Sequence, residues 1–101
     1  MARKVLGIHF VCRNGLNIEE LGDSRFKSGD WKVSEQAADT ALYLALHDQK
    51  NSSSYKQGII ESWEHYEGEG GRIIFYVKEF DRPLEWVGDG TGEKGYCWSE
   101  N

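Results

Sequence analysis

The sequence has no long apolar run, only one proline and only two cysteines among its 101 residues. A membrane-spanning helix needs about 20 consecutive apolar residues, and no segment approaches that length. The start, Met1-Ala2-Arg3-Lys4, leads into a short apolar stretch interrupted by His9, which is unlike an export signal. We therefore expect a soluble, cytoplasmic protein with no membrane partner.

The chain also has no low-complexity linker and no internal repeat. A length of 101 residues is too short for two domains that each bury a core of their own. The sequence therefore predicts a single domain over residues 1–101. Within it, the closely spaced glycines that begin the segment 88–101 are turn signals, and we expect this segment to form a mobile tail.

Positive charge is scarce: 12 Lys and Arg against 17 Asp and Glu give a net charge of −5. Such a chain has no overall positive field to attract nucleic acid, so any such binding must be local. The charge is unevenly spread. Residues 1–33 carry six basic and four acidic side chains, a balance of +2, whereas residues 34–101 carry six and thirteen, a balance of −7.

The two cysteines, Cys12 and Cys97, are too few for a disulfide scaffold, and in a reducing compartment we expect free thiols. The cysteines and histidines show neither CxxC nor HxxxH spacing, so no metal site is expected. The glycines at 88, 90 and 92 have the wrong spacing for a dinucleotide loop, and no helical pattern follows them. The sequence therefore predicts no cofactor.

Alternating apolar residues predict several strands and little helix. Strands are expected over 4–12, 42–46, 55–66 and 72–80, with a bulge or burial on both faces near Gly58. One capped helical turn is expected over 17–22, a polar loop over 23–30 and a second short helix from the Ser34 cap to about Ala41. Pro83 makes residues 84–87 an edge strand or an extended arm.

A glycine-rich connection over 67–71 joins the last two long strands as a hairpin. A chain of this size must bury its sheet against itself or against one helix. The predicted fold class is therefore α+β, a small mixed β pseudo-barrel with one or two short helices.

Four tryptophans and five tyrosines are many for so short a chain. Some of these rings must fill the core, since each buries a large area. We expect the others to line a cleft, where each could stack on a base or a ligand ring.

The segment 46–58 places a histidine, lysines, hydroxyls and a tyrosine together between two strands. Lys50 and Lys56 could hold a phosphate there while Tyr55 stacks, although a solvated connection is the simpler interpretation. His47 lies on the face opposite Leu44, where it could donate to a ligand or bond a backbone carbonyl. The predicted ligand-binding residues are Trp31, Lys32, His47, Lys50, Ser54, Tyr55, Lys56 and Trp63.

The segment from Ala41 to Val87 resembles the PUA-like superfamily, in particular its ASCH and EVE branches. The resemblance covers about half of the chain. It consists of an apolar strand that ends in Leu46-His47, a Lys/Ser/Tyr loop, the Gly58-Ile59-Ile60 strand opening and the return strand before a Pro-Leu arm. It implies a pseudo-barrel whose cleft takes RNA or a modified nucleobase, with counterparts at Gly58, the loop and an aromatic residue such as Trp31 or Trp63. The chain is shorter than most EVE domains and is acidic.

The leading hypothesis is therefore a domain that binds RNA or a modified nucleobase in an aromatic-lined cleft. The alternative is a protein-interaction or regulatory module that uses the acidic second half of the chain. A third hypothesis, an amide or nucleoside hydrolase, would use Lys56 and Glu61 as an acid/base pair. Acidic sheet proteins commonly offer such pairs, so an enzyme is the less favoured expectation and no catalytic residue is assigned.

Overall fold

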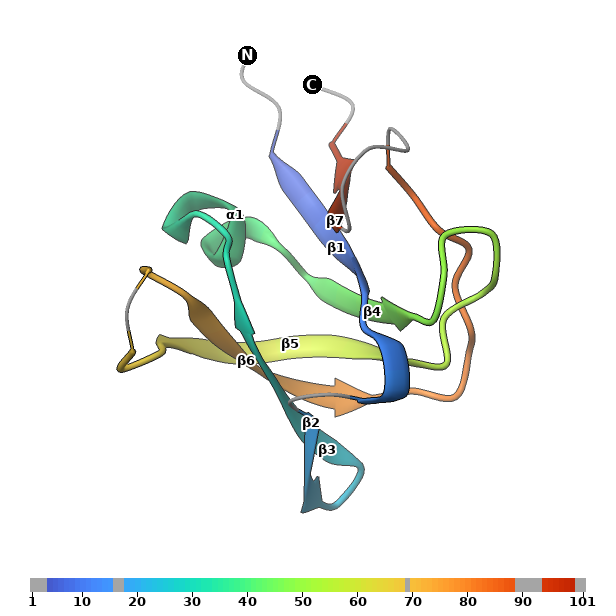
Figure 1. Ribbon diagram of the computed structural model, residues 1–101, viewed down its shortest axis with the longest axis horizontal. Coiled ribbons are helices and arrows are strands. Elements are labelled where there is room, and N and C mark those ends of the chain that lie inside the picture. Colours follow the sequence, from blue (N-terminus) through green and yellow to red (C-terminus); the bar gives the residue numbers. More distant parts are fainter. Residues whose placement is uncertain (1–3, 16–17, 69, 89–93, 100–101) are drawn as a thin grey trace.

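The computed structural model describes residues 4–15, 18–68, 70–88 and 94–99, and Figure 1 shows their arrangement. In these residues, seven strands form one sheet, accompanied by a single turn of 3-10 helix and one short α-helix. The strands are β1 (Val5–Val11), β2 (Ile18–Gly22), β3 (Arg25–Trp31), β4 (Tyr43–His47), β5 (Lys56–His65), β6 (Ile73–Glu79) and β7 (Lys94–Trp98), and the helices are η1 (Arg13–Gly15) and α1 (Glu35–Thr40).

The sheet has the strand order β2-β3-β6-β5-β4-β1-β7. Neighbouring strands run antiparallel except β1 and β4, which are parallel. A parallel pair needs a long crossover, and here the β2–β3 hairpin and α1 supply it. The sheet is strongly curled. The ring of Phe10 on β1 stacks on the ring of Trp31 on β3, with centres 3.9 Å apart, although three strands lie between β1 and β3 in the strand order.

The curled sheet encloses the apolar core. Alternate residues of β1, β3, β4 and β6 point into it, and two alanines of α1 close one side. The fully buried members with no exposed surface are Ile8, Phe26, Leu44, Leu46, Ile73, Phe75 and Val77. The strands predicted around these residues, all except Phe26, are confirmed, with each end differing by one position.

The predicted α+β class is wrong, because only six of the described residues form α-helix and the described part of the chain is nearly all β. The helical turn expected within 17–22 and the polar loop expected over 23–30 are instead the β2–β3 hairpin. Its turn residues Asp23 and Ser24 both have positive φ, 53° and 62°. A two-residue turn of this kind favours Asn-Gly or Asp-Gly, so Asp-Ser gave no hairpin signal. The exposed β2 also lacks the apolar alternation of a half-buried strand.

The second expected helix is confirmed as α1. The Ser34 hydroxyl accepts a hydrogen bond from the Ala37 amide at 3.1 Å, and the helix ends before Ala41, which has extended backbone angles. The predicted bulge lies between Ile60 and Ser62, just after Gly58. Residues 84–87 form an extended arm with no strand pairing.

Within the predicted tail, Lys94–Trp98 forms β7 and pairs with β1. Residues 89–93 and 100–101 lie outside the described part of the chain. No helix in the described part is long and apolar enough to cross a membrane.

Candidate functional site

The two tryptophans predicted to line a cleft are held by the fold itself. Trp31 lies against Phe10 and donates its indole N–H to the Ser28 hydroxyl at 2.9 Å. Trp63 packs against the core and donates to Asp39 at 3.1 Å. Both rings are therefore half-buried supports of the curled sheet.

The predicted lysines are dispersed. The Lys56 ammonium lies 2.6 Å from a Glu20 carboxylate oxygen and 3.1 Å from Glu79, above the ring of Phe26. Burial alone would lower the pKa of Lys56, but the hydrogen bonds to Glu20 and Glu79 outweigh it and raise the pKa. Lys50 lies 5.9 Å from the centre of the Trp86 ring.

Ser54 and Tyr55 anchor the loop between β4 and β5. The buried Ser54 hydroxyl donates to Gln57 at 2.6 Å and accepts from the Leu84 amide at 2.8 Å. The Tyr55 hydroxyl donates to the backbone carbonyl of Cys12. These hydroxyls satisfy backbone and side-chain groups of the fold.

The third hypothesis needs Lys56 and Glu61 to act together, and the structure places them in separate ion pairs. Glu61 pairs with Arg25 at 2.7 Å, which lowers the pKa of the Glu61 carboxyl. Lys56 is held by Glu20 and Glu79 as described.

His47 belongs to a buried chain of hydrogen bonds that crosses from β4 to β1. His47 and His9 have 0% and 1% of their surface exposed, and their rings meet through Nε2 of His47 and Nδ1 of His9 at 2.9 Å. The other nitrogen of His47 lies 2.9 Å from the carbonyl of Ser52, and the other nitrogen of His9 lies 3.0 Å from the Tyr43 hydroxyl. We call Tyr43, His9, His47 and the Ser52 carbonyl the relay.

The strand register explains why these side chains meet. His9 lies opposite Ala45 in the parallel pairing, so Tyr43 and His47, two residues to either side of Ala45, flank it on the same face. The small Ala45 side chain leaves room for the imidazole. His47 therefore bonds a backbone carbonyl, which is one of the two roles the sequence suggested.

The hydrogen bonds fix the protons of the neutral relay. A carbonyl only accepts, so Nδ1 of His47 carries the hydrogen and its Nε2 accepts. His9 must then donate through Nδ1 and accept at Nε2 from the Tyr43 hydroxyl. In this arrangement, with both imidazole rings uncharged, every donor in the relay has an acceptor.

Burial keeps the rings neutral. It lowers the pKa of His9 to about 4, with a further contribution from the neighbouring His47. Burial also lowers the pKa of His47, against the Ser52 hydrogen bond and the Glu85 charge, which raise it. The pKa of Tyr43 is raised by burial and by a hydrogen bond with the Cys97 thiol.

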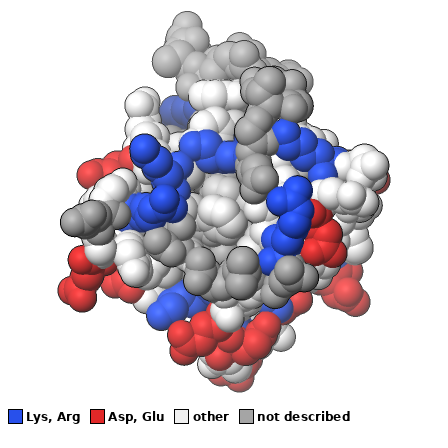
Figure 2. Space-filling model, viewed as in Figure 1, with Lys and Arg blue, Asp and Glu red and all other residues white. Residues whose placement is uncertain are grey.

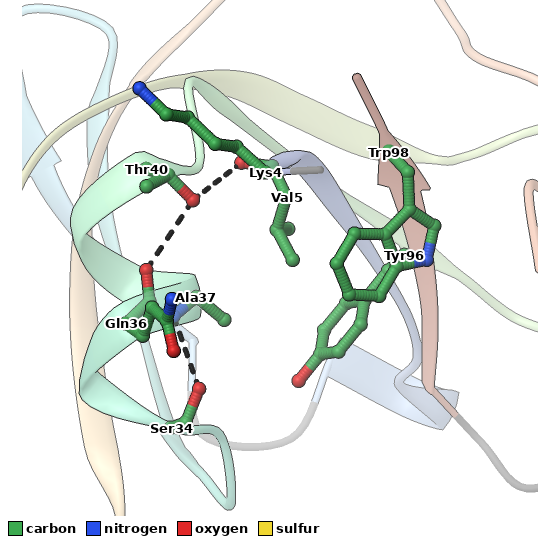
Figure 3. Close-up of a pocket in the computed structure, with 8 residues that line it drawn as sticks. All are labelled: Lys4, Val5, Ser34, Gln36, Ala37, Thr40, Tyr96 and Trp98. Atoms are coloured by element: carbon green, nitrogen blue, oxygen red, sulfur yellow. Dashed lines mark hydrogen bonds between the residues drawn. The ribbon is translucent and has the colours of Figure 1, made fainter. Parts of the chain in front are cut away.

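A pocket of about 130 Å³ lies on another part of the molecule, between β7 and the beginning of α1 (Figure 3). Tyr96 and Trp98 of β7 form one side, and the other side comes from the Ser34 cap and first turn of α1. Val5 lies between the two sides in the figure, and Lys4 and Thr40 lie at one end. The Thr40 hydroxyl donates to the carbonyl of Val5 at 2.7 Å, which ties the helix to β1.

The same two aromatic residues line a second, more open hollow of about 450 Å³. Its other lining residues are Val87, Gly88, Lys94 and Gly95. Tyr96 and Trp98 meet edge to face with their ring centres 5.6 Å apart, and Trp98 is 43% exposed. We call these two rings, with the pocket and the hollow beside them, the β7 aromatic site.

Lysines border the β7 aromatic site. The Lys94 ammonium lies 5.4 Å from the centre of the Tyr96 ring and donates to the backbone carbonyl of Lys32 at 2.8 Å. Lys4 lines the pocket itself. Of the residues predicted from the sequence, Lys32 is therefore the one beside this site.

Sequence reasoning missed the site because it assigned residues 88–101 to a tail. The available signal was the period of two in Tyr96 and Trp98, which places both rings on one face of a strand. The described residues contain no group of three or more His, Cys, Asp or Glu side chains that could hold a metal ion. Comparison with protein-family models, curated proteins and solved structures finds no match.

Proposed function

We propose that this domain binds single-stranded RNA, or a nucleobase within it, at the β7 aromatic site. The observation that carries the proposal is the pair of rings, Tyr96 and Trp98, that lines two hollows and stands among lysines. An engineered cavity of about 150 Å³ accommodates benzene, so a pocket of about 130 Å³ suits part of one aromatic ring. Aromatic side chains bind single strands by stacking, which tolerates different bases.

Local charge supports the same ligand class. Lys4 and Lys94 line the two hollows of the site, on a chain whose net charge is −5. On the face drawn in Figure 2, Lys and Arg gather mostly toward the middle and upper half around uncharged atoms, and Asp and Glu lie mostly toward the margin. Ammonium groups that contact phosphates give the salt-dependent part of nucleic-acid affinity.

Polar groups in the pocket can read a base edge. The Gln36 amide offers both a donor and an acceptor, and Ser34 has a hydroxyl that can donate while it caps the helix. RNA-binding proteins commonly combine stacking with hydrogen bonds to an unstacked base. The resemblance to PUA-like domains stays a prediction and implies the same ligand class.

The proposal is tested by titrating short single-stranded RNA into the full chain at low and at high salt. Trp98→Ala should weaken binding about 5- to 150-fold, because one stacking contact is worth about 1–3 kcal/mol. Tyr66→Ala is the matched control, since Tyr66 is similarly exposed and lies in the loop after β5.

Equal effects of the two substitutions would move the binding surface away from Trp98. The absence of binding even at low salt would remove RNA binding altogether and favour the alternative, a protein-interaction module.

A further inference from the structure

The segment 81–88, which we call the arm, runs along the side of the molecule next to the loop between β4 and β5 (Figure 1). It forms no strand, and only Leu84 and Trp86 among its residues are partly buried. Two hydrogen bonds join Leu84 to Ser54: the Ser54 amide donates to the Leu84 carbonyl, and the Leu84 amide donates to the Ser54 hydroxyl, both at 2.8 Å. The arm is also joined to Ser53 through Glu85, and Val87 and Gly88 lie close against Gly95 of β7.

Trp86 covers the histidine pair of the relay. Its ring meets His9 and His47 edge to face, with centres 5.9 Å and 5.2 Å away. The indole N–H of Trp86 is buried and has no hydrogen-bond partner in the described part of the chain. A buried N–H without a hydrogen-bond partner costs free energy. The packing of Trp86 over the imidazoles, which excludes water from them, is therefore less stable than a fully hydrogen-bonded contact would be.

A first proton can enter the relay only if the hydrogen bond between His9 and Tyr43 reverses. The hydrogen between the two rings can then lie on Nδ1 of His9 or on Nε2 of His47. His9 would then donate through Nε2 to the Tyr43 oxygen, and the Tyr43 hydrogen would turn to the Cys97 thiol. A second proton leaves two adjacent cations with no acceptor between them.

The surroundings stabilise these charges only weakly, because the Ser52 carbonyl and the Glu85 charge favour the His47 cation but burial outweighs them. The titratable groups that face the pair are Tyr43 from β4, Cys97 from β7, Glu85 from the arm and Lys50 from the loop after β4. None of the hydrogen bonds described for the two imidazoles comes from a carboxylate. Charge on the pair is therefore poorly solvated while Trp86 covers it and well solvated once water enters.

We infer that the arm is an acid-opened lid over His9 and His47, with Trp86 as its seal. Protonation favours the open position because the imidazoles then reach water, and removal of the proton lets the neutral relay and its cover form again. Val87 and Gly88 also line the open hollow of the β7 aromatic site, so opening alters that hollow as well.

NMR spectra of the ¹⁵N-labelled full chain, recorded from pH 7 to pH 4, test this inference. Three signals are followed: the imidazole nitrogens, the Trp86 indole N–H and exchange of the Leu84 amide, corrected for the intrinsic effect of pH. Below about pH 6.5, the ratio of open to closed arm should rise by up to about tenfold per pH unit for each histidine that protonates only when open. The Trp31 indole, bonded to the Ser28 hydroxyl, serves as the reference and should remain unchanged.

Two variants sharpen the experiment. His9→Asn together with His47→Asn should remove most of the pH response of Leu84, whereas His65→Asn, at an exposed histidine outside the relay, should preserve it. The measurement on the unaltered chain decides the question even where the double variant does not fold.

Three results would overturn the inference. The imidazoles could gain protons while Trp86 and Leu84 stay unchanged. Trp86, Leu84 and the Trp31 reference could all change at one pH, which would mean global unfolding. The double variant could also keep the full response.

Discussion

Gly7 lies directly beneath the ring of Tyr43, so that a Cβ atom added to Gly7 would overlap the ring. The two residues are paired in the parallel register of β1 and β4. On the other side of β1, Gly7 is paired with Cys97 of β7, which explains how Tyr43 reaches both His9 and the Cys97 thiol. The position of the relay's hydroxyl therefore depends on the absence of a side chain at residue 7.

Gly7→Ala should destabilise the fold by about 1–3 kcal/mol, the usual cost of overpacking a buried site. The ring of Tyr43 must move, which breaks its hydrogen bond to His9. Urea denaturation measures the free energy of unfolding of Gly7→Ala, of Tyr43→Ala and of the chain that carries both substitutions. The chain with both should lose less stability than the sum of the two single losses, because the clash is then absent. Simple additivity would show that the two residues do not clash.

The histidine pair should make stability depend on pH in one direction. Above about pH 6.5 the ring of His9 is neutral in both folded and unfolded chains. Between pH 6.5 and the folded pKa of about 4, the unfolded chain takes up the proton and the folded chain does not. As the pH is lowered through this window, His9 therefore reduces the free energy of unfolding by at most about 1.4 kcal/mol per pH unit, or about 3 kcal/mol in all.

This loss is measured by urea denaturation at intervals from pH 7 to pH 4 for the unaltered chain and for His9→Asn. Carboxylates also take up protons in acid and change the free energy of unfolding, but they do so in both chains, so the difference between the two chains leaves their contribution out. The His9→Asn chain should lose less stability across the window. Parallel pH curves would contradict a neutral, buried His9. The value for the unaltered chain is an upper bound where the arm opens, because the folded chain then takes up the proton too.

Part of this arrangement could be predicted from the sequence. The alternation over residues 42–47 placed Tyr43 and His47 on one face and Leu44 and Leu46 on the other, and the structure confirms both faces. The partner His9 could not be predicted, since it lies 38 positions away and reaches His47 only through the parallel pairing of β1 with β4. A strand pattern gives the face of a residue but not the neighbouring strand.

The β2–β3 hairpin and the β7 aromatic site were missed for a different reason. In both places tertiary pairing prevailed over the local turn signals on which the prediction was based. Asp23-Ser24 is an uncommon pair for a turn with two positive φ values, and the glycines after Val87 suggested a tail. In the folded chain, pairing with β6 and β1 makes strands of Arg25–Trp31 and Lys94–Trp98.

Lys94 and Lys56 should differ in their contribution to RNA affinity, because their ammonium groups have different partners. Lys56 is 13% exposed and is paired with both Glu20 and Glu79, whereas Lys94 lies beside Tyr96 with a backbone carbonyl as its acceptor. Lys94→Met should weaken binding and reduce the slope of log affinity against log salt by about 0.7 for each phosphate that Lys94 neutralises. Lys56→Met should leave both quantities unchanged, because two carboxylates already neutralise that charge.

Titrations at four salt concentrations give the slopes, and circular dichroism checks that both variants are folded. If Lys56→Met weakened binding as much as Lys94→Met, the RNA-binding surface would extend to the loop between β4 and β5, as the sequence alone suggested.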